Sequence, residues 1–345
     1  MLEKCLEDLE QRIDPGEEEI LISRWEAFWG GGAGDGVFIP RRVNAKPSGF
    51  DWPETSVNSA FSSPGMMALQ QLKMCSDALS SGGGALLCLR CNYGTGILPS
   101  VFGGELFMME DELNTLPTSK PLDGGIGGIV DAGVPDICGG LGAKVFETAE
   151  FFKDILRDYP MMKKYVKIYH PDLQGPMDVC ELLWGSGLFT ALIDRPDFVH
   201  GLLSIVTETY KRFMTEWLKV VPLSGEFSVH WGMLMRGGVM LRDDSAMNLS
   251  PAMFEEFIKP YDEDILEAFG GGAVHFCGRG DHYIKKASGI TNLYAVNMSQ
   301  PELNDMDKIF ENTLEKGIKI IGFNKDSAEK LLQSGKSSGK NLQCF

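Results

Sequence analysis

The chain has 345 residues, of which 43% are hydrophobic and 23% are charged, a composition that excludes a disordered or fibrous protein. Forty-eight acidic and 32 basic residues give a formal net charge of -16, so nucleic acid and anionic membranes are not expected as partners. The first residues lack the apolar centre of a signal peptide, and no stretch reaches the roughly 18 apolar residues of a membrane span. We therefore expect a cytoplasmic protein whose eight cysteines are free thiols or metal ligands.

Short apolar runs alternate with helical patterns along the chain. Residues 1–35 are expected to form an N-terminal helical extension. The later runs are short and strongly apolar, which is typical of buried parallel strands. They lie at Gly36–Pro40, Ala85–Arg90, Tyr165–His170, Phe227–Trp231, Ala273–Cys277, Leu293–Asn297 and Lys319–Phe323.

Two amphipathic helices are predicted between these strands. The first begins at Pro196 and carries apolar residues at helical spacing as far as Trp217. The second has Ser250 as N-cap and Pro251 as its first residue, and it ends in the run Gly270–Gly272. This alternation, over the whole length 1–345, predicts a single α/β domain with the architecture of a (β/α)8 TIM-type barrel. A doubly wound open sheet is the alternative.

Polar side chains close several of the predicted strands. In a parallel barrel the active site lies at the C-terminal ends of the strands, so residues at these positions are candidates for binding a small-molecule substrate. Any one of them could instead be a partly buried side chain that caps a turn. The candidates are Arg90, Tyr93, Gln174, His230 and Trp231.

His275 and Cys277 form the sharpest local feature. Residues two apart on a strand point to the same side, so an imidazole and a thiolate can hold one metal ion, and this pair favours zinc. A third ligand would come from elsewhere in the chain. We expect Cys344, on a tail that folds back over the barrel mouth, with His282 or Glu105 as weaker candidates. The alternative is a metal-free pocket.

Asp243 and Asp244 form a carboxylate pair just before the helix capped by Ser250. Such a pair on a loop could position a substrate, bind a cation or act as a base. The alternative for one of the two is a solvated acidic turn. No glycine-rich segment has the context of a dinucleotide fold or a P-loop, so nucleotide binding is poorly supported.

Four segments of the chain carry a family resemblance when they are read together. They are Asp172-Leu-Gln174-Gly175-Pro176 with Leu183-Trp-Gly185, Asp243-Asp244 with Leu249-Ser250-Pro251 and Phe254–Tyr261, His275-Phe-Cys277-Gly278, and Ile318–Gly322. In order and spacing they resemble the uroporphyrinogen decarboxylase superfamily, which includes the decarboxylase and zinc-dependent methylcobamide:thiol methyltransferases. The resemblance implies a (β/α)8 barrel with its site at the C-terminal mouth.

Within the superfamily, the chain resembles the methyltransferase branch at His275 and Cys277, with Cys344 as the later cysteine. The N-terminal arginine signature of the authentic decarboxylase is absent. The resemblance therefore implies zinc-dependent methyl transfer from a methylated corrinoid, carried on a small separate protein, to a thiol. Asp243 or Asp244 would orient the substrates, together with Arg90 and Tyr93.

Two further functions remain open at this point. One is decarboxylation of a porphyrinogen or another tetrapyrrole, as in porphyrin biosynthesis, with Asp243 or Asp244 stabilising a protonated pyrrole and Arg90 holding a carboxylate. The other is a corrinoid- or tetrapyrrole-binding module that has no catalytic activity. Thiol-dependent demethylation would identify the methyltransferase, carbon dioxide release the decarboxylase, and ligand binding without turnover the binding module.

Overall fold

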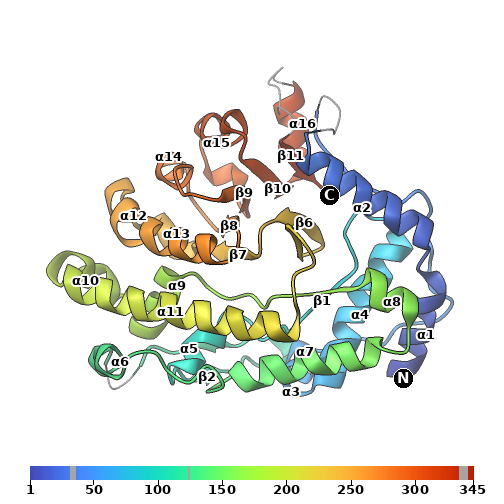
Figure 1. Ribbon diagram of the computed structural model, residues 1–345, viewed down its shortest axis with the longest axis horizontal. Coiled ribbons are helices and arrows are strands. Elements are labelled where there is room, and N and C mark those ends of the chain that lie inside the picture. The colour runs from blue at the N-terminus through green and yellow to red at the C-terminus, as the bar shows by residue number, and fades with distance from the viewer. Residues whose placement is uncertain (32–35, 123–124, 334–340) are drawn as a thin grey trace.

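The computed structural model describes residues 1–31, 36–122, 125–333 and 341–345. It has a mixed α/β fold in which helices surround a central group of strands (Figure 1). The strands are β1 (Cys88–Arg90), β2 (Leu106–Phe107), β3 (Thr118–Ser119), β4 (Lys167–Tyr169), β5 (Phe227–His230), β6 (Met233–Arg236), β7 (Val239–Arg242), β8 (Gly272–Phe276), β9 (Leu293–Met298), β10 (Lys319–Phe323) and β11 (Leu342–Cys344). The helices are α1 (Leu2–Arg12), α2 (Pro15–Trp29), α3 (Val57–Ser62), α4 (Pro64–Ser81), α5 (Ile97–Val101), α6 (Gly127–Ala132), α7 (Gly142–Leu156), α8 (Pro160–Tyr165), α9 (Pro176–Trp184), α10 (Gly187–Asp194), α11 (Pro196–Val220), α12 (Pro251–Phe257), α13 (Lys259–Ala268), α14 (Ile284–Ala287), α15 (Met306–Asn312) and α16 (Lys325–Gln333). Short 3-10 turns lie at η1 (Asp111–Leu113), η2 (Asp244–Asn248), η3 (Pro301–Leu303) and η4 (Leu314–Lys316).

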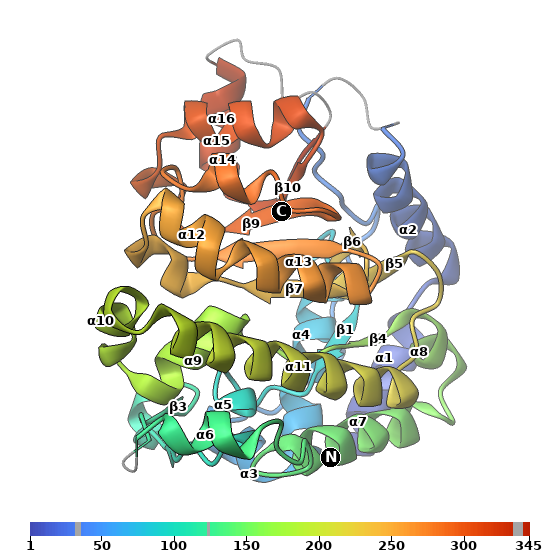
Figure 2. The same ribbon diagram turned by 60° about the vertical axis from the view of Figure 1, so that its left-hand side comes forward.

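A five-stranded parallel sheet organises the C-terminal half. Its strands follow in chain order from β7 to β11, and helical segments connect them on the outside (Figure 2). The register places Arg242 opposite His275, and His275 opposite Asn297. Since the carboxyl ends of parallel strands meet at one edge of the sheet, these three side chains emerge side by side.

The remaining strands pair separately. β1 pairs with β4 in parallel, whereas β5 and β6 form an antiparallel hairpin. The strand predicted at Phe227–Trp231 is therefore present but is not parallel, because the chain reverses at once after His230. Strand pairing among the described residues stops short of the predicted closed barrel of eight parallel strands.

A histidine links two of these sheets. The backbone N–H of Met240 on β7 donates to Nε2 of His170, which directly follows β4, at 3.0 Å. Nδ1 of His170 lies 2.8 Å from the carbonyl of Pro171, so it carries the ring proton and donates to that oxygen. Both ring nitrogens are thus used, and burial lowers the pKa of His170 to about 4. The neutral imidazole takes the place of a ladder hydrogen bond between β4 and β7.

The hairpin fills the space enclosed by the parallel sheet. Ala273 and Ala295, on β8 and β9, are small residues that leave room for Met233 and Met235 of β6 in one buried cluster. α2 contributes Trp25 and Phe28 to the same cluster, which ties this N-terminal helix to the strands. Large side chains thus interdigitate with small ones, as close packing requires.

The predicted helices are present with one correction. α11 begins at Pro196 as expected, and the Ser250 hydroxyl accepts from the backbone N–H of Met253 as an N-cap. The helix after Ser250 is not continuous, however, but divides into α12 and α13. Pro260 explains the break, because its ring lacks an N–H and clashes with the preceding turn of a helix.

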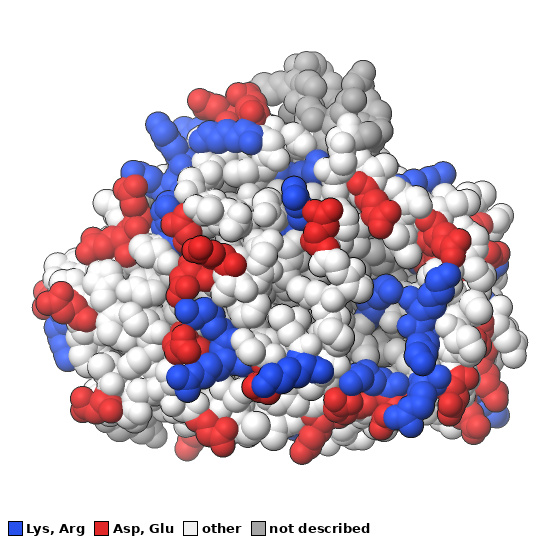
Figure 3. Space-filling model, viewed as in Figure 1, with Lys and Arg blue, Asp and Glu red and all other residues white. Residues whose placement is uncertain are grey.

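The surface shows no dominant charge on the face in Figure 3, where acidic and basic side chains are interspersed among uncharged ones. In the part of the chain that the structure describes, no helix is both long enough and apolar enough to cross a membrane.

Candidate active site

Three potential metal ligands meet at the C-terminal ends of β7 and β8. The ligand atoms of Asp244, His275 and Cys277 all lie within 4.8 Å of one another. Nε2 of His275 is 3.4 Å from Sγ of Cys277 and 3.9 Å from Oδ1 of Asp244. The predicted proximity of His275 and Cys277 is therefore confirmed, and the third donor beside them is Asp244.

Asn297 fixes the orientation of His275. Its amide nitrogen donates to the carbonyl of Ile321 at 2.7 Å, so its Oδ1 must face Nδ1 of His275, 2.6 Å away. Nδ1 therefore carries the ring proton, and Nε2 presents a lone pair toward Cys277 and Asp244. Burial also lowers the pKa of His275, which favours the neutral imidazole. A hydrogen bond of this kind on the distal nitrogen is a usual feature of metal-binding histidines.

Asp244 is held from both sides. Its backbone N–H donates to Asp178 at 2.9 Å, and Asp178 also accepts from the N–H of Ser245 at 2.8 Å. Its own Oδ1 accepts from the backbone N–H of Cys277 at 2.8 Å. These bonds place the Asp244 carboxylate next to the thiol while its side chain stays 40% exposed, so an incoming molecule can reach it.

Asp243 points away from this group. It is fully buried, and its carboxyl forms a pair with that of Asp262 on α13. Burial, together with the neighbouring Asp262, raises the pKa of Asp243 well above its ordinary value. We expect the pair to hold a proton, because two adjacent carboxylates cannot both ionise in a buried site. Asp243 therefore lies on the opposite side from Asp244, since alternate residues after a strand face opposite sides.

A buried cluster of charges lies beside the metal-ligand group. Asp172 forms ion pairs with Arg90 and with Arg242, the latter at 2.6 Å, and Nε2 of His230 lies 3.3 Å from the same carboxylate. Burial alone would raise the pKa of Asp172, but the two guanidinium groups outweigh it and lower that pKa. Two arginines facing one aspartate leave an excess positive charge at this edge of the sheet.

Trp231 occupies a strained position at the tip of the hairpin. His230 pairs with Met233, so the turn consists of Trp231 and Gly232, both with positive φ, at 48° and 74°. A left-handed conformation costs a residue with a side chain roughly 1–2 kcal/mol, and such strain is typical of functional positions. The Trp231 ring lies 5.1 Å from that of His275, and the Arg242 guanidinium lies 4.6 Å above it.

A cavity of ≈ 540 Å³ opens beside these groups. Its lining includes two predicted site residues, Trp231 and His275, together with Asn297. The other lining residues are Met298, Ser299, Gly322 and Asn324. Sequence reasoning placed Asn297 in a strand without assigning it a role, although a polar residue closing an apolar strand is the signal that pointed to His275.

Other predicted residues lie outside this cavity. Tyr93 is fully buried, and its hydroxyl pairs with that of Thr148 at 2.7 Å, so it belongs to the hydrophobic core rather than to a substrate surface. Gln174 is buried, and its amide nitrogen has no partner among the described residues. Nε2 of His282 lies 2.9 Å from the carbonyl oxygen of Leu249. Neither His282 nor Glu105 belongs to the metal-ligand group of the described residues.

The structure does not bring Cys344 to Cys277. Cys344 lies in β11 opposite Phe323, and its side chain is fully buried in the hydrophobic core. β9 and β10 separate its strand from β8, and three strand spacings amount to roughly 14 Å. This corrects the predicted position of Cys344: apolar Leu342 and Cys344 add a strand to the sheet. Residues 334–340 of the predicted tail lie outside the described residues.

Comparisons with known proteins bear on the fold. No protein-family model matches the sequence, and no curated protein does. Among solved structures, the chain is similar to a methyltransferase from Methanosarcina mazei, with a TM-score of 0.65 and 17% sequence identity. The similarity covers 94% of this chain and 91% of that chain. At this identity the likeness supports a shared architecture along nearly the whole chain.

Proposed function

We propose that this chain is a zinc-dependent methyltransferase that passes a methyl group from a methylated corrinoid to a thiol. The observation that carries the proposal is the convergence of Asp244, His275 and Cys277 at the edge of the parallel sheet. The similarity in fold to a methyltransferase agrees with it.

The donor set suits zinc. Catalytic zinc sites usually have three protein ligands of the nitrogen, sulfur and oxygen types and one open position. His275 presents a lone pair because Asn297 holds its other nitrogen, and Cys277 and the half-exposed Asp244 face the same point. Zinc bound by these residues would lower the pKa of an incoming thiol and so favour the nucleophilic thiolate.

The surrounding residues would orient the two substrates. The Trp231 ring lines the cavity and lies next to the His275 ring. Arg242, stacked on that ring and paired with Asp172, supplies positive charge next to the reacting group. The corrinoid would approach from the open side of the cavity, presented by a small carrier protein.

A decarboxylase-type reaction has less support in the geometry. It would use Asp243 or Asp244 to stabilise a protonated pyrrole, but Asp243 is buried against Asp262. It would also use Arg90 to hold a carboxylate, yet Arg90 already pairs with Asp172. Methyl transfer remains the function that the arrangement of Asp244, His275 and Cys277 favours.

A methylcobalamin demethylation assay tests the proposal. Protein purified without chelator is analysed for zinc and then incubated with methylcobalamin and 2-mercaptoethanol, while the absorbance of the cobalamin is followed. We expect about one zinc per chain and a demethylation rate that depends on both thiol and protein. Zinc without demethylation would reject methyl transfer but retain the metal site, and protein without zinc would reject both.

Histidine variants provide the matched control. His275→Ala should lose zinc and activity, since it removes a donor from the group. His200→Ala should retain both, because His200 lies on α11 and its ring contacts Tyr261 at 2.7 Å. Equal losses in the two variants would point to a general effect on folding.

A further inference from the structure

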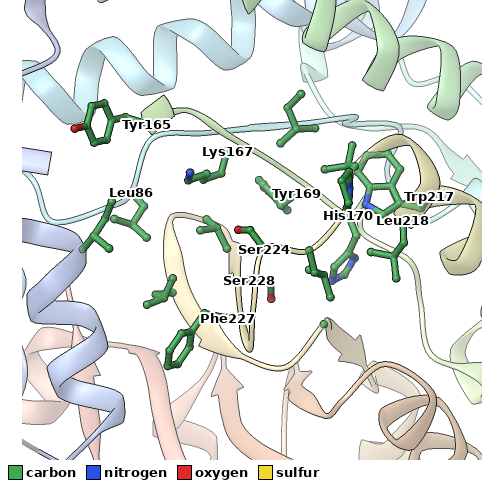
Figure 4. A pocket seen from close by; sticks show the side chains of 18 of the residues that line it. Leu86, Tyr165, Lys167, Tyr169, His170, Trp217, Leu218, Ser224, Phe227 and Ser228 are labelled. Carbon is green, nitrogen blue, oxygen red and sulfur yellow. The ribbon is translucent and has the colours of Figure 1, made fainter. Parts of the chain in front are cut away.

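A second cavity lies at the opposite end of the strands from the metal-ligand group. It has a volume of ≈ 300 Å³ and opens where β4, β5 and β7 begin, between α2 and the end of α11. Its walls are largely apolar and include Leu86, Trp217 and Phe227 (Figure 4). Cavities of this size with a few polar groups are the usual form of small-molecule sites.

Lys167 supplies a positive charge at the solvent-exposed edge of this cavity. The side chain extends from β4 into the space bounded by Leu86, Tyr165 and Phe227, and Ser224 enters the same space from the segment before β5 (Figure 4). The Lys167 ammonium donates to the carbonyl of Lys164 at 2.7 Å, and no carboxylate of the described residues lies within ion-pair distance of it. Lys167 is exposed to solvent at one side of the cavity, and its partial burial, reinforced by the nearby Lys164 ammonium, lowers its pKa.

The other titratable groups around the cavity leave this charge uncompensated. Glu18 is buried and engaged by Arg42 through two bonds of 2.5 and 2.8 Å. The Tyr165 hydroxyl donates a hydrogen bond to Glu19. Both ring nitrogens of His170 already take part in hydrogen bonds to the backbone. Glu26 is exposed on α2 and lines only the rim. A ligand that enters among the apolar side chains therefore meets an ammonium.

We propose that this cavity binds a small carboxylic acid with an apolar body. The carboxylate would pair with Lys167 and accept a hydrogen bond from Ser224, while the apolar body packs against Leu86, Trp217 and Phe227. The solvent-exposed ammonium of Lys167 at the edge of the cavity attracts an opposite charge, and the apolar walls favour the hydrocarbon part. This site is separate from the candidate active site and does not depend on the function proposed for it.

Binding of octanoate, octan-1-ol and octylamine to the full chain tests the proposal by isothermal titration calorimetry. We expect octanoate to bind with a 1:1 stoichiometry and more tightly than octan-1-ol, and octylamine to bind most weakly. Octanoate should bind the His275→Ala variant unchanged. Absence of octanoate binding, or tighter binding of octylamine, would overturn the proposal.

Two lysine variants locate the charge. Lys167→Met keeps the length of the side chain, and we expect it to weaken octanoate binding by about 10-fold while leaving octan-1-ol binding unaffected. Lys164→Met is the matched control, because Lys164 pairs with Glu19 and does not line the cavity. Equal octanoate affinities in Lys167→Met and the unmodified chain would refute the role of Lys167.

A third variant tests the position of the ligand without removing a buried group. Ser224 is exposed, so Ser224→Trp should fold normally, as circular dichroism can verify, and its indole should block the cavity. We expect loss of binding of both octanoate and octan-1-ol. Full binding in a folded Ser224→Trp variant would place the ligand elsewhere and reject this cavity as the site.

Discussion

Asn297→Ala is the substitution that most directly probes the candidate active site. Asn297 Oδ1 accepts a hydrogen bond of 2.6 Å from Nδ1–H of His275 and thereby leaves Nε2 free for a metal. Without this bond, the imidazole can adopt the other tautomer, in which Nε2 carries the proton, and the ring can also turn. Loss of such an outer hydrogen bond typically lowers metal affinity by about 10–100-fold, which corresponds to about 1.4–2.7 kcal/mol.

The assay is competition of the protein with a chromophoric chelator for zinc. Asn297→Ala should also destabilise the fold by about 1–3 kcal/mol, because the buried carbonyl of Ile321 loses its donor. Asn312→Ala is a matched control, since Asn312 donates to the carbonyl of Lys308 at 2.9 Å within α15 and has no part in the site. It should lose stability and keep the affinity for zinc.

Asn297→Asp separates the two roles of the amide. An aspartate at this position retains an acceptor for His275 Nδ1 but has no donor for Ile321. Zinc affinity should therefore recover above that of Asn297→Ala, although stability remains reduced. The reasoning is refuted if a folded Asn297→Ala protein binds zinc as tightly as the unmodified chain.

Three other changes have defined outcomes. Burial lowers the pKa of Lys319, whose ammonium lies 4.3 Å above the Phe28 ring, to about 8. Because the unfolded chain binds this proton more tightly, the free energy of unfolding should rise from pH 8 to 10.5. In urea unfolding, Lys319→Met should lack this rise and should gain up to about 3 kcal/mol at pH 7. Burial raises the pKa of Asp262 to about 7, so the folded state holds this proton more tightly than the unfolded chain. The free energy of unfolding should therefore fall as the pH rises from about 4 to 7. Asp262→Asn should show a smaller fall, measured by urea unfolding at both ends of this range. Gly322→Ala, at φ 66° with a Cβ 2.5 Å from Nδ2 of Asn297, should cost about 1–2 kcal/mol in thermal unfolding and weaken zinc binding in the chelator assay.

Much of the sheet was predictable because buried parallel strands are short and apolar. Ala273–Cys277, Leu293–Asn297 and Lys319–Phe323 correspond closely to β8, β9 and β10. The neighbouring strand at Val239–Arg242 escaped prediction because it follows a glycine pair and is only four residues long. The hairpin was missed because a Trp-Gly turn is not a usual signal for a two-residue turn, which normally has Asn or Asp before the glycine.

The candidate site was predictable where two donors lie close in sequence. His275 and Cys277 are two residues apart, so strand geometry alone brings them together. Asp244 was identified as one of a pair, but only the register between β7 and β8 shows that it, and not Asp243, meets them. Cys344 was predicted as a ligand because a thiolate binds zinc. The ability of a side chain to bind zinc does not reveal which strand of the sheet a residue distant in sequence will join.

Costly features gather around the Asp244, His275 and Cys277 group. Trp231 has a left-handed backbone, and Asp243 and Asp262 are buried together with no ion-pair partner among the described residues. Two arginines compete for the single carboxylate of Asp172. Trp231 and Gly232 take the positive φ that their two-residue hairpin turn requires, whereas the buried carboxyl pair and the shared aspartate are not needed to close a sheet or fill a core. The position of these buried charges beside the metal-ligand group agrees with the proposed function, because functional sites commonly depart from what stability alone would favour.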